Sequence, residues 1–224
     1  MKSTLFADDT VSVRSNNNLG KLHNSLNHEM TKVMDWLTAN KLSLNISKTK
    51  YMLIANEHVS TESFVINVKS NRIERTLTYM YLDVIVDEKL TRKEHCKQLC
   101  CILSKYVGVM YEVKHYVNNQ ALRMLYHSLI NSRAQYGNIT WGRAASCHLQ
   151  PISVVLNRTM GCLNTDKFLT NKVTTIYKMQ KILQLKDIFN LEVSKFMYKH
   201  TTSQLPATFN KYFKLITDVH CSFV

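Results

Sequence analysis

The sequence predicts an α+β protein in which a mixed amino-terminal part is followed by an all-helical part. In residues 1–95, short apolar runs of strand period surround one long run of helical period. In residues 96–224, long windows of helical spacing contain little glycine or proline. Hydrophobic residues make up 45% of the 224 positions, which is enough to bury a core in one large or two small domains. We therefore expect a domain boundary near residue 95.

Each element of the amino-terminal part has a local signal. Apolar residues on both sides of Asp8-Asp9 predict a tight β-hairpin over 5–13, with both carboxylates at its tip. Apolar residues three or four apart predict an amphipathic helix over 19–39, capped by the asparagines at 16–18. Further strands are predicted as a pair formed by 42–46 and 51–54, and at 64–68 and 79–86.

The carboxyl-terminal part is predicted to be helical. Residues 99–117 and 120–132 have helical spacing, and Pro151 and Gly161 are expected to bracket one short helix. One or two more helices are expected over 174–198. The stripe predicted to be buried there consists of Ile176, Met179, Ile182, Leu183, Ile188, Leu191 and Phe196.

Charge distinguishes the two parts. The chain carries 29 Lys and Arg against 16 Asp and Glu, a net charge of +13, of which residues 96–224 contribute +11 and residues 1–95 only +2. Basic side chains spread over a folded domain favour contacts with nucleic-acid phosphates, and a basic surface that only confers solubility is the alternative. The candidate phosphate contacts are Lys97, Lys105, Lys114, Arg123, Arg133 and Arg143.

Aromatic residues of the helical part give less support to nucleic-acid binding. Tyr116, Tyr126, Tyr136 and Trp141 lie at apolar spacings, so we interpret them as core residues rather than as platforms for stacking bases.

The cysteine pattern indicates reduced thiols. The six cysteines lack the paired short spacings of a disulfide framework or a zinc ribbon. His95, Cys96 and Cys100 are able to share one side of a helix, but no second ligand pair lies at zinc-site spacing, so we expect core or surface cysteines. Neither a secretory leader nor a membrane-spanning run is evident. We expect an intracellular protein of the nucleus, the cytoplasm or both, with no membrane partner.

Asp8 and Asp9 are the residues best suited to carry chemistry. Adjacent carboxylates at a hairpin tip offer oxygen ligands to Mg2+ or Mn2+, and Mg2+ prefers one or two carboxylates together with substrate phosphates. Paired ions of this kind activate a 3′-hydroxyl and stabilise the leaving pyrophosphate in nucleotidyl transfer. The alternative is an Asp-Asp-Thr β-turn whose carboxylates make only local hydrogen bonds.

The surroundings of this pair favour the metal site. LFADDT at 5–10 is followed, after the amphipathic helix, by DWLTANKLSLNISKTK at 35–50. In order and spacing these segments resemble the reverse transcriptases of non-LTR (LINE) retrotransposons of the jockey type. YLDVIVD at 81–87, YHSLI at 126–130 and YGNITWG at 136–142 are similar to that family's primer grip, its thumb and the segment after it. Leu205-Pro206 and Tyr212-Phe213 are similar to its tail, so the resemblance covers nearly the whole chain.

The resemblance implies an RNA-directed DNA polymerase that uses an RNA template, a DNA primer, deoxynucleoside triphosphates and Mg2+ or Mn2+. Asp8 matches the direct metal ligand of the family's [FY]ADD motif, and Asp9 matches the assisting carboxylate. Lys48 matches a lysine near the leaving pyrophosphate, where a cation neutralises charge or donates a proton; a solvated turn lysine is the alternative. Tyr81 and Leu82 match the primer-grip turn, with an ordinary core strand as the alternative.

Departures from the family's pattern limit this expectation. With residues 1–95 as the end of the palm and 96–224 as the thumb and connecting region, the third metal-binding aspartate and the fingers would lie before residue 1. Asp83 and Arg92 stand where the family usually has glycine and tryptophan, and RTMG at 158–161 replaces a more basic stretch, which we interpret as decay. We expect no catalysis by these residues alone. The alternatives are a non-catalytic protein that binds RNA or an RNA–DNA duplex, and a transposon relic without function.

Overall fold

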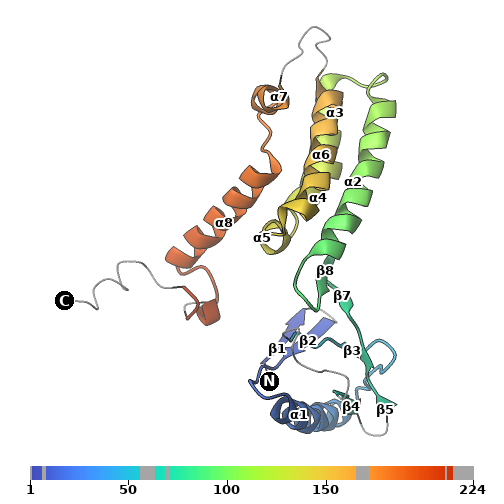
Figure 1. The fold of residues 1–224 in the computed structure, drawn as a ribbon, viewed down its shortest axis with the longest axis vertical. Helices are drawn as coiled ribbons and strands as arrows, with labels where there is room; N and C mark the ends of the chain where they lie inside the picture. Colours follow the sequence, from blue (N-terminus) through green and yellow to red (C-terminus); the bar gives the residue numbers. More distant parts are fainter. Residues whose placement is uncertain are drawn as a thin grey trace, which may run out of the picture. The chain divides into compact units, whose positions relative to one another are not determined.

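The computed structural model describes residues 2–6, 9–55, 64–68, 71–164, 172–209 and 211–213. The chain divides into two compact units, Met1–Leu90 and Thr91–Val224, which we call unit 1 and unit 2 (Figure 1). Unit 1 combines strands with a long helix, whereas the described residues of unit 2 form helices and connecting turns. The predicted α+β class is confirmed at this level.

Unit 1 opens with the predicted hairpin. β1 (Lys2–Phe6) pairs antiparallel with β2 (Asp9–Val13), and the register places Phe6 opposite Asp9. The hydroxyl groups of Ser3 and Ser12 are hydrogen-bonded across the pair at 2.8 Å. Beyond the hairpin, the Arg14 guanidinium binds the Glu29 carboxylate at 2.8 Å, which ties the end of β2 to the following helix.

That helix, α1 (Leu19–Ala39), has the predicted bounds. Asn18 caps it, because its side-chain oxygen accepts a hydrogen bond of 3.0 Å from the Lys21 amide. After Ala39 the backbone turns at Lys41, whose φ of 57° lies in the left-handed region. The apolar stripe of α1 covers a small core made of Leu22, Leu53, Phe64, Ile66, Val68 and Ile73.

The strand pair predicted over 42–54 is wrong, and local hydrogen bonding explains why. The Asn45 carbonyl accepts from the Thr49 hydroxyl at 2.8 Å, and the Asn45 side chain accepts from the Ser47 hydroxyl at 2.7 Å. Asparagine turns of this kind compete with strand ladders. The strands that form instead are short: β3 (Lys50–Tyr51) pairs in parallel with β6 (Glu74–Arg75), and β4 (Asn67–Val68) pairs with β5 (Asn71–Arg72). The predicted strand 64–68 thus enters a ladder only at its last two residues.

The segment predicted as one strand over 79–86 is a second tight hairpin. β7 (Thr78–Tyr81) and β8 (Val84–Asp87) pair antiparallel around Leu82-Asp83. Both turn residues are left-handed, with φ of 47° and 59°. Two consecutive positive φ values define a type I′ turn, whose twist matches that of the flanking strands. The sequence hides this turn because it lacks the usual Asn-Gly or Asp-Gly pair.

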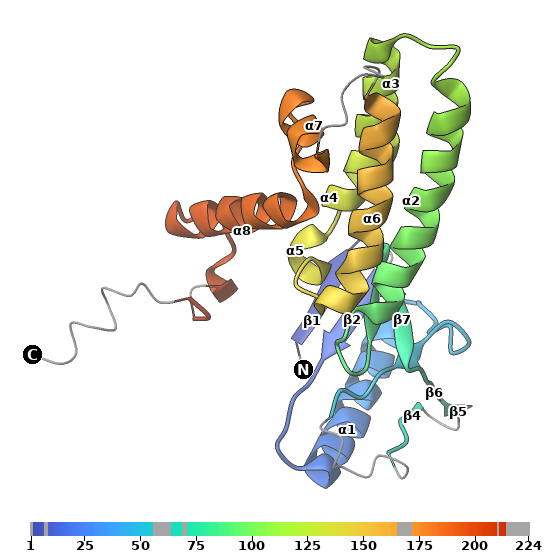
Figure 2. The ribbon, with the colours of Figure 1, turned by 45° about the horizontal axis from the view of Figure 1, so that its top comes forward.

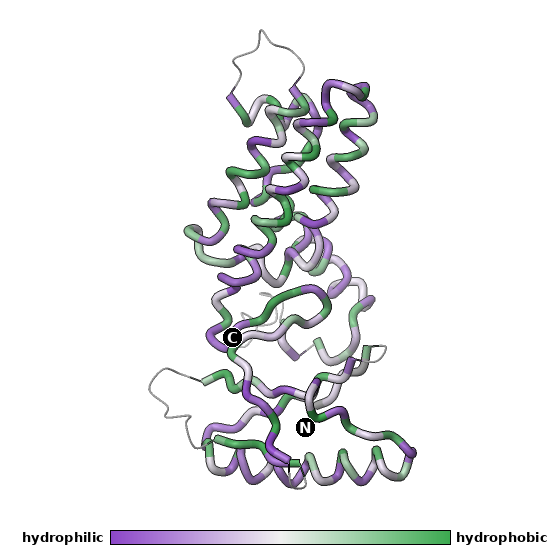
Figure 3. The backbone as a smooth tube through the Cα atoms, turned by 90° about the vertical axis from the view of Figure 1, so that its right-hand side faces the viewer, coloured by the Kyte–Doolittle hydropathy of each residue, from purple (hydrophilic) through white to green (hydrophobic). Residues whose placement is uncertain are grey.

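Unit 2 is built on two long helices that lie side by side, α2 (Lys93–Val113) and α6 (Ser146–Leu163) (Figures 1 and 2). Figure 3 shows apolar and polar residues alternating along the helices, as expected when one face of each is buried. The segments between them are α3 (Asn119–Leu125), a π-helical turn η1 (Tyr126–Asn131), α4 (Ser132–Gln135) and α5 (Asn138–Trp141).

The short helix expected between Pro151 and Gly161 is wrong, because both residues lie inside α6. One face of α6 is buried in the core of unit 2, where Ile152, Leu156 and Met160 are at most 2% exposed. The burial of this continuous face overrides the local preferences of one proline and one glycine.

Two helices close the described part of unit 2, α7 (Val173–Met179) and α8 (Leu185–Thr201), and a single 3-10 turn (Ala207–Phe209) follows them. The predicted buried stripe is correct at Ile176, Ile182 and Ile188. It is wrong at Met179, Leu183 and Leu191, which are 54%, 42% and 37% exposed. The helical conformation is interrupted between α7 and α8, where Lys181 has a φ of 52°. A single helical period therefore does not run through the segment. Phe196 is half-buried and its ring contacts those of Phe209 and Phe213.

Candidate functional site

The β1–β2 hairpin presents Asp9 to solvent. Asp9 is the first residue of β2 and is exposed, and its side chain forms no hydrogen bond or ion pair with any described residue. Asp8 lies outside the described residues. An exposed carboxylate beside a second one in the sequence is a suitable donor set for Mg2+. Among the residues that the structure describes, no three His, Cys, Asp or Glu side chains lie close enough together to hold a metal ion.

Lys48 lies in the turn organised by Asn45. Its amide donates to the Asn45 side-chain oxygen at 3.2 Å, and its own side chain is exposed. The amine forms no ion pair with the described residues, in contrast to that of nearby Lys50, which binds Glu74 at 3.2 Å. Neither Asp9 nor Lys48 is joined to the other by a hydrogen bond or an ion pair. Lys48 is thus an exposed cation on a hydrogen-bonded turn. This geometry fits both a lysine near the leaving pyrophosphate and a solvated turn lysine.

The third predicted feature is the turn at Tyr81-Leu82. Both residues are half-buried, and Asp83 at the outer side of the turn is exposed. The preceding strand exposes Met80 at 57% and Tyr79 at 41%. The β7–β8 hairpin is therefore a tight turn preceded by two exposed apolar side chains that point to opposite faces of the strand.

The candidate phosphate contacts are spread over several elements of unit 2. Lys97 and Lys105 are exposed on the same side of α2, about two turns apart. Between Glu94 and Glu112, α2 carries no other carboxylate, so Lys97 and Lys105 are the only charged residues of this stretch. Arg133 in α4 and Arg143 after α5 are also exposed.

The two remaining candidates have partners inside unit 2. The Arg123 guanidinium donates to the Gln180 carbonyl at 2.7 Å, which ties α3 to the end of α7. The Lys114 amine lies 4.5 Å from the centre of the Tyr111 ring. The structure thus brings Lys97 and Lys105 onto one helix face and gives Arg123 a structural contact.

Asn138 and Trp141 are the buried members of a hydrogen-bonded cluster around α5, of which sequence reasoning predicted only Trp141 as a core residue. Trp141 is fully buried and its indole N–H donates to the Tyr136 carbonyl at 2.9 Å. The Asn138 side chain donates to the Ala134 carbonyl at 3.0 Å, and the Arg92 guanidinium donates to the Thr140 carbonyl at 3.1 Å. The His95 ring contacts that of Trp141, and burial lowers the pKa of His95. This cluster joins the start of α2 to α5.

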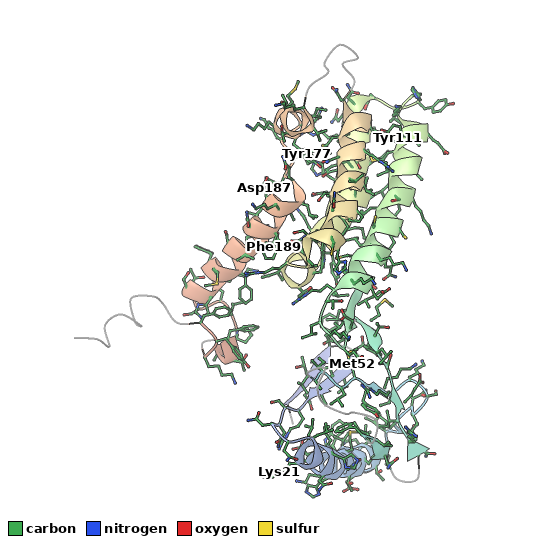
Figure 4. All side chains as sticks on the ribbon, in the orientation of Figure 1. Lys21, Met52, Tyr111, Tyr177, Asp187 and Phe189 are labelled. Carbon is green, nitrogen blue, oxygen red and sulfur yellow. The ribbon has the colours of Figure 1, made fainter. Side chains whose placement is uncertain are left out.

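Gly142 allows α8 to approach this cluster. A Cβ atom added to Gly142 would lie 2.6 Å from the Asn138 carbonyl oxygen and 2.7 Å from a ring carbon of Phe189. In Figure 4 the Phe189 side chain extends from α8 toward α5. The local sequence does not indicate this role, because Phe189 is distant in sequence, whereas Gly137 in the same segment supplies a turn with a φ of 58°.

Of the four aromatic residues predicted to be core, two are buried and two are not. Trp141 and Tyr126 are 0% and 1% exposed, which confirms the prediction for them. Burial raises the pKa of Tyr126, and it raises that of Tyr177 to about 12. Tyr116 and Tyr136 are 89% and 52% exposed, so the prediction is wrong for both. Tyr116 lies beyond the end of α2, where the helical spacing used to place it no longer applies.

The cysteines of α2 are divided between its two faces. Cys96 is buried in the core and Cys101 is exposed. Burial raises the pKa of the Cys96 thiol to about 11, so this thiol stays protonated and is poorly suited to bind a metal.

Comparison with known proteins identifies no relative: no family model matches the chain, and neither a curated protein nor a solved structure is similar to it. In the described part of the chain, no helix has the length and apolar character needed to cross a membrane.

Proposed function

We propose that this chain is a carboxyl-terminal part of a non-LTR reverse transcriptase, with the end of the palm in unit 1 and a basic helical thumb in unit 2. The observation that carries the proposal is the β1–β2 hairpin, whose second strand begins at Asp9, the residue that follows Asp8 in the sequence. It is followed in order by the capped helix α1, the Lys48 turn and the type I′ hairpin β7–β8. The same order of features supports the assignment of each site residue.

Within this proposal Asp8 and Asp9 hold Mg2+ or Mn2+ through carboxylate oxygens, and Lys48 lies on the side of the leaving pyrophosphate. The metal ion, held by these carboxylates together with substrate phosphates, would neutralise charge and activate a primer 3′-hydroxyl. The turn at Tyr81-Leu82 contacts the end of the primer. Two carboxylates are too few ligands to fix a pair of ions and an incoming nucleotide, so residues 1–224 by themselves bind a primer–template duplex without extending it.

A second candidate function is RNA–DNA or RNA duplex binding without any polymerase role. The specific observation in its favour is the exposed side of α2, where Lys97 and Lys105 lie in a stretch without carboxylates between Glu94 and Glu112. Such a helix face fits phosphate contacts that position a duplex without reading its sequence.

Primer extension on an RNA template with Mg2+ and deoxynucleotides separates these functions when duplex binding and metal binding are followed in the same samples. We expect the wild-type chain to bind Mn2+ and the duplex and to extend nothing. The double variant Asp8→Asn/Asp9→Asn should lose Mn2+ binding and keep duplex affinity or gain some, because two negative charges disappear. Asp35→Asn, which removes an exposed carboxylate of α1, is the matched control.

Unaltered Mn2+ binding in the double variant would contradict the metal site and leave the second candidate function. Extension by the wild type and not by the double variant would show that residues 1–224 suffice for catalysis and that the two carboxylates are required for it.

A further inference from the structure

One end of unit 2 combines strong positive charge with an exposed aromatic ring. We call it the Tyr116 end and define it as residues 111–123, 157–164 and 172–181. Figures 1 and 2 show that the end of α2, the start of α3, the end of α6 and α7 meet there. Glu112 is the single carboxylate among these described residues. The basic residues of the Tyr116 end are Lys114, Arg123, Arg158, Lys172, Lys178 and Lys181.

Contacts between the helices fix this end as one surface. The Tyr111 hydroxyl donates to the Arg158 carbonyl at 3.2 Å, which joins α2 to α6. The Tyr177 hydroxyl donates to the Asn157 side chain at 3.2 Å, which joins α7 to α6, and Arg123 binds the Gln180 carbonyl. The labels of Tyr111 and Tyr177 in Figure 4 mark the two sides of this end.

Tyr116 stands out from this surface on a defined turn. Its side chain is 89% exposed, while its amide donates to the Val113 carbonyl at 2.9 Å. On the other side of the turn, Asn118 caps α3 by accepting from the Ala121 amide at 2.8 Å. The ring is therefore held away from the core by a backbone that is hydrogen-bonded on both sides. A fully exposed aromatic ring on an ordered turn leaves both of its faces available for stacking.

The surroundings of the ring favour nucleic acid over protein as its partner. The neighbours of Tyr116 in the turn include Lys114, His115 and Asn118, whereas the centre of a protein interface is depleted of charge. Lysines and arginines around an exposed aromatic ring are the combination that binds single strands, since cations contact phosphates while bases stack on the ring. A duplex does not suit Tyr116, because its bases are already stacked on each other.

We propose that the Tyr116 end binds an unpaired polynucleotide strand, with the Tyr116 ring stacked on a base and the surrounding lysines and arginines on phosphates. This inference rests on the proposed function for nucleic acid as the partner. It adds a second contact, because the lysines of α2 bind the paired region and the Tyr116 end binds a strand that is not paired. RNA and DNA share this chemistry.

The test measures the affinity of the full chain for labelled oligo(U), oligo(dT) and an RNA–DNA duplex, each about 12 nucleotides long, by fluorescence anisotropy. Tyr116→Ala should weaken binding of at least one single strand about 5- to 100-fold and leave duplex affinity unchanged. Tyr116→Phe should bind as the wild type does, because it keeps the ring. Tyr198→Ala, at a tyrosine of α8 that is 65% exposed, is the matched control and should change nothing.

Which single strand responds identifies the source as RNA or DNA. Wild-type affinity of Tyr116→Ala for both strands would overturn the inference, as would a Tyr116→Phe variant as weak as Tyr116→Ala. Duplex binding without single-strand binding by the wild type would overturn this inference alone. A wild-type chain that binds neither the duplex nor a single strand would overturn both this inference and the proposed nucleic-acid function.

Discussion

Asp83 occupies a turn position whose backbone conformation is less favourable for aspartate than for glycine. With a φ of 59°, it occupies a conformation that glycine adopts freely and that costs other residues roughly 1 kcal/mol. We expect Asp83→Gly to raise the free energy of unfolding by roughly 0.5–1 kcal/mol in urea denaturation. Asp35→Gly, inside α1, should lower it by a similar amount, because glycine is a poor helix former. A loss of stability in Asp83→Gly would show that the side chain itself stabilises the turn.

Two glycines of unit 2 should respond to the same substitution in opposite directions. Gly142→Ala places a Cβ atom against the Asn138 carbonyl oxygen, which is fixed by the hydrogen bond it accepts from Gly142. We expect a loss of about 1–3 kcal/mol in urea denaturation. Gly108→Ala meets nothing within 4 Å on the exposed side of α2 and should gain up to about 1 kcal/mol from helix propensity. Equal effects at the two positions would mean that neither Asn138 nor Phe189 packs closely against Gly142.

His95 makes the stability of unit 2 depend on pH. Because burial lowers its pKa, the unfolded chain binds a proton more readily than the folded chain does. The stabilisation is therefore present above the usual imidazole pKa of about 6.5 and is lost as pH falls below it. We expect the urea midpoint to fall between about pH 7.5 and about pH 5.5, and to fall less in His95→Gln. His28→Gln, at an exposed position, is the control for the loss of one imidazole.

At the scale of elements, the sequence predicts best where local and tertiary preferences agree. In α1 the asparagine cap, the helical period and the turn after Ala39 all indicate the same bounds, and the structure has them. Around Asn45 the alternating apolar residues favour a strand, yet side-chain hydrogen bonds to the backbone produce a turn. In α6 the local signals of Pro151 and Gly161 favour ends, yet burial of one face continues the helix.

In the candidate site, too, features that depend on neighbours in sequence were predicted and others were not. The apolar arms around Asp8-Asp9 predict the β1–β2 hairpin, because a two-stranded pairing with a short connection depends on neighbours in sequence. Tyr116 was predicted as core from spacing alone. Its exposure follows from the end of α2 at Val113 and from the turn that its amide forms with the Val113 carbonyl, neither of which the helical spacing marks. The structural role of Gly142 was not predicted either, because it depends on Phe189, which is distant in sequence.

At the scale of the whole molecule, the two units have separate cores. The buried cluster around Leu22 and Phe64 lies within unit 1, and the cluster from Cys96 to Leu185 lies within unit 2. The charge follows the same boundary, since residues 1–90 have a net charge of +1 and residues 91–224 a net charge of +12. Unit 2 is therefore expected to fold by itself and to carry most of the nucleic-acid binding.

A fragment of residues 91–224 should fold with the helical content of unit 2 and keep the duplex affinity of the full chain, whereas residues 1–90 should bind the duplex weakly. Because its contacts are to phosphates, the affinity of the larger fragment should fall steeply between about 50 and 200 mM salt, by about tenfold or more. Lys97→Ala/Lys105→Ala should make this salt dependence shallower, and Lys195→Ala, whose amine is paired with Glu192 at 2.9 Å, should not. A flat salt response of residues 91–224 would contradict duplex binding through lysine and arginine contacts to phosphates, because counterion release accompanies such contacts.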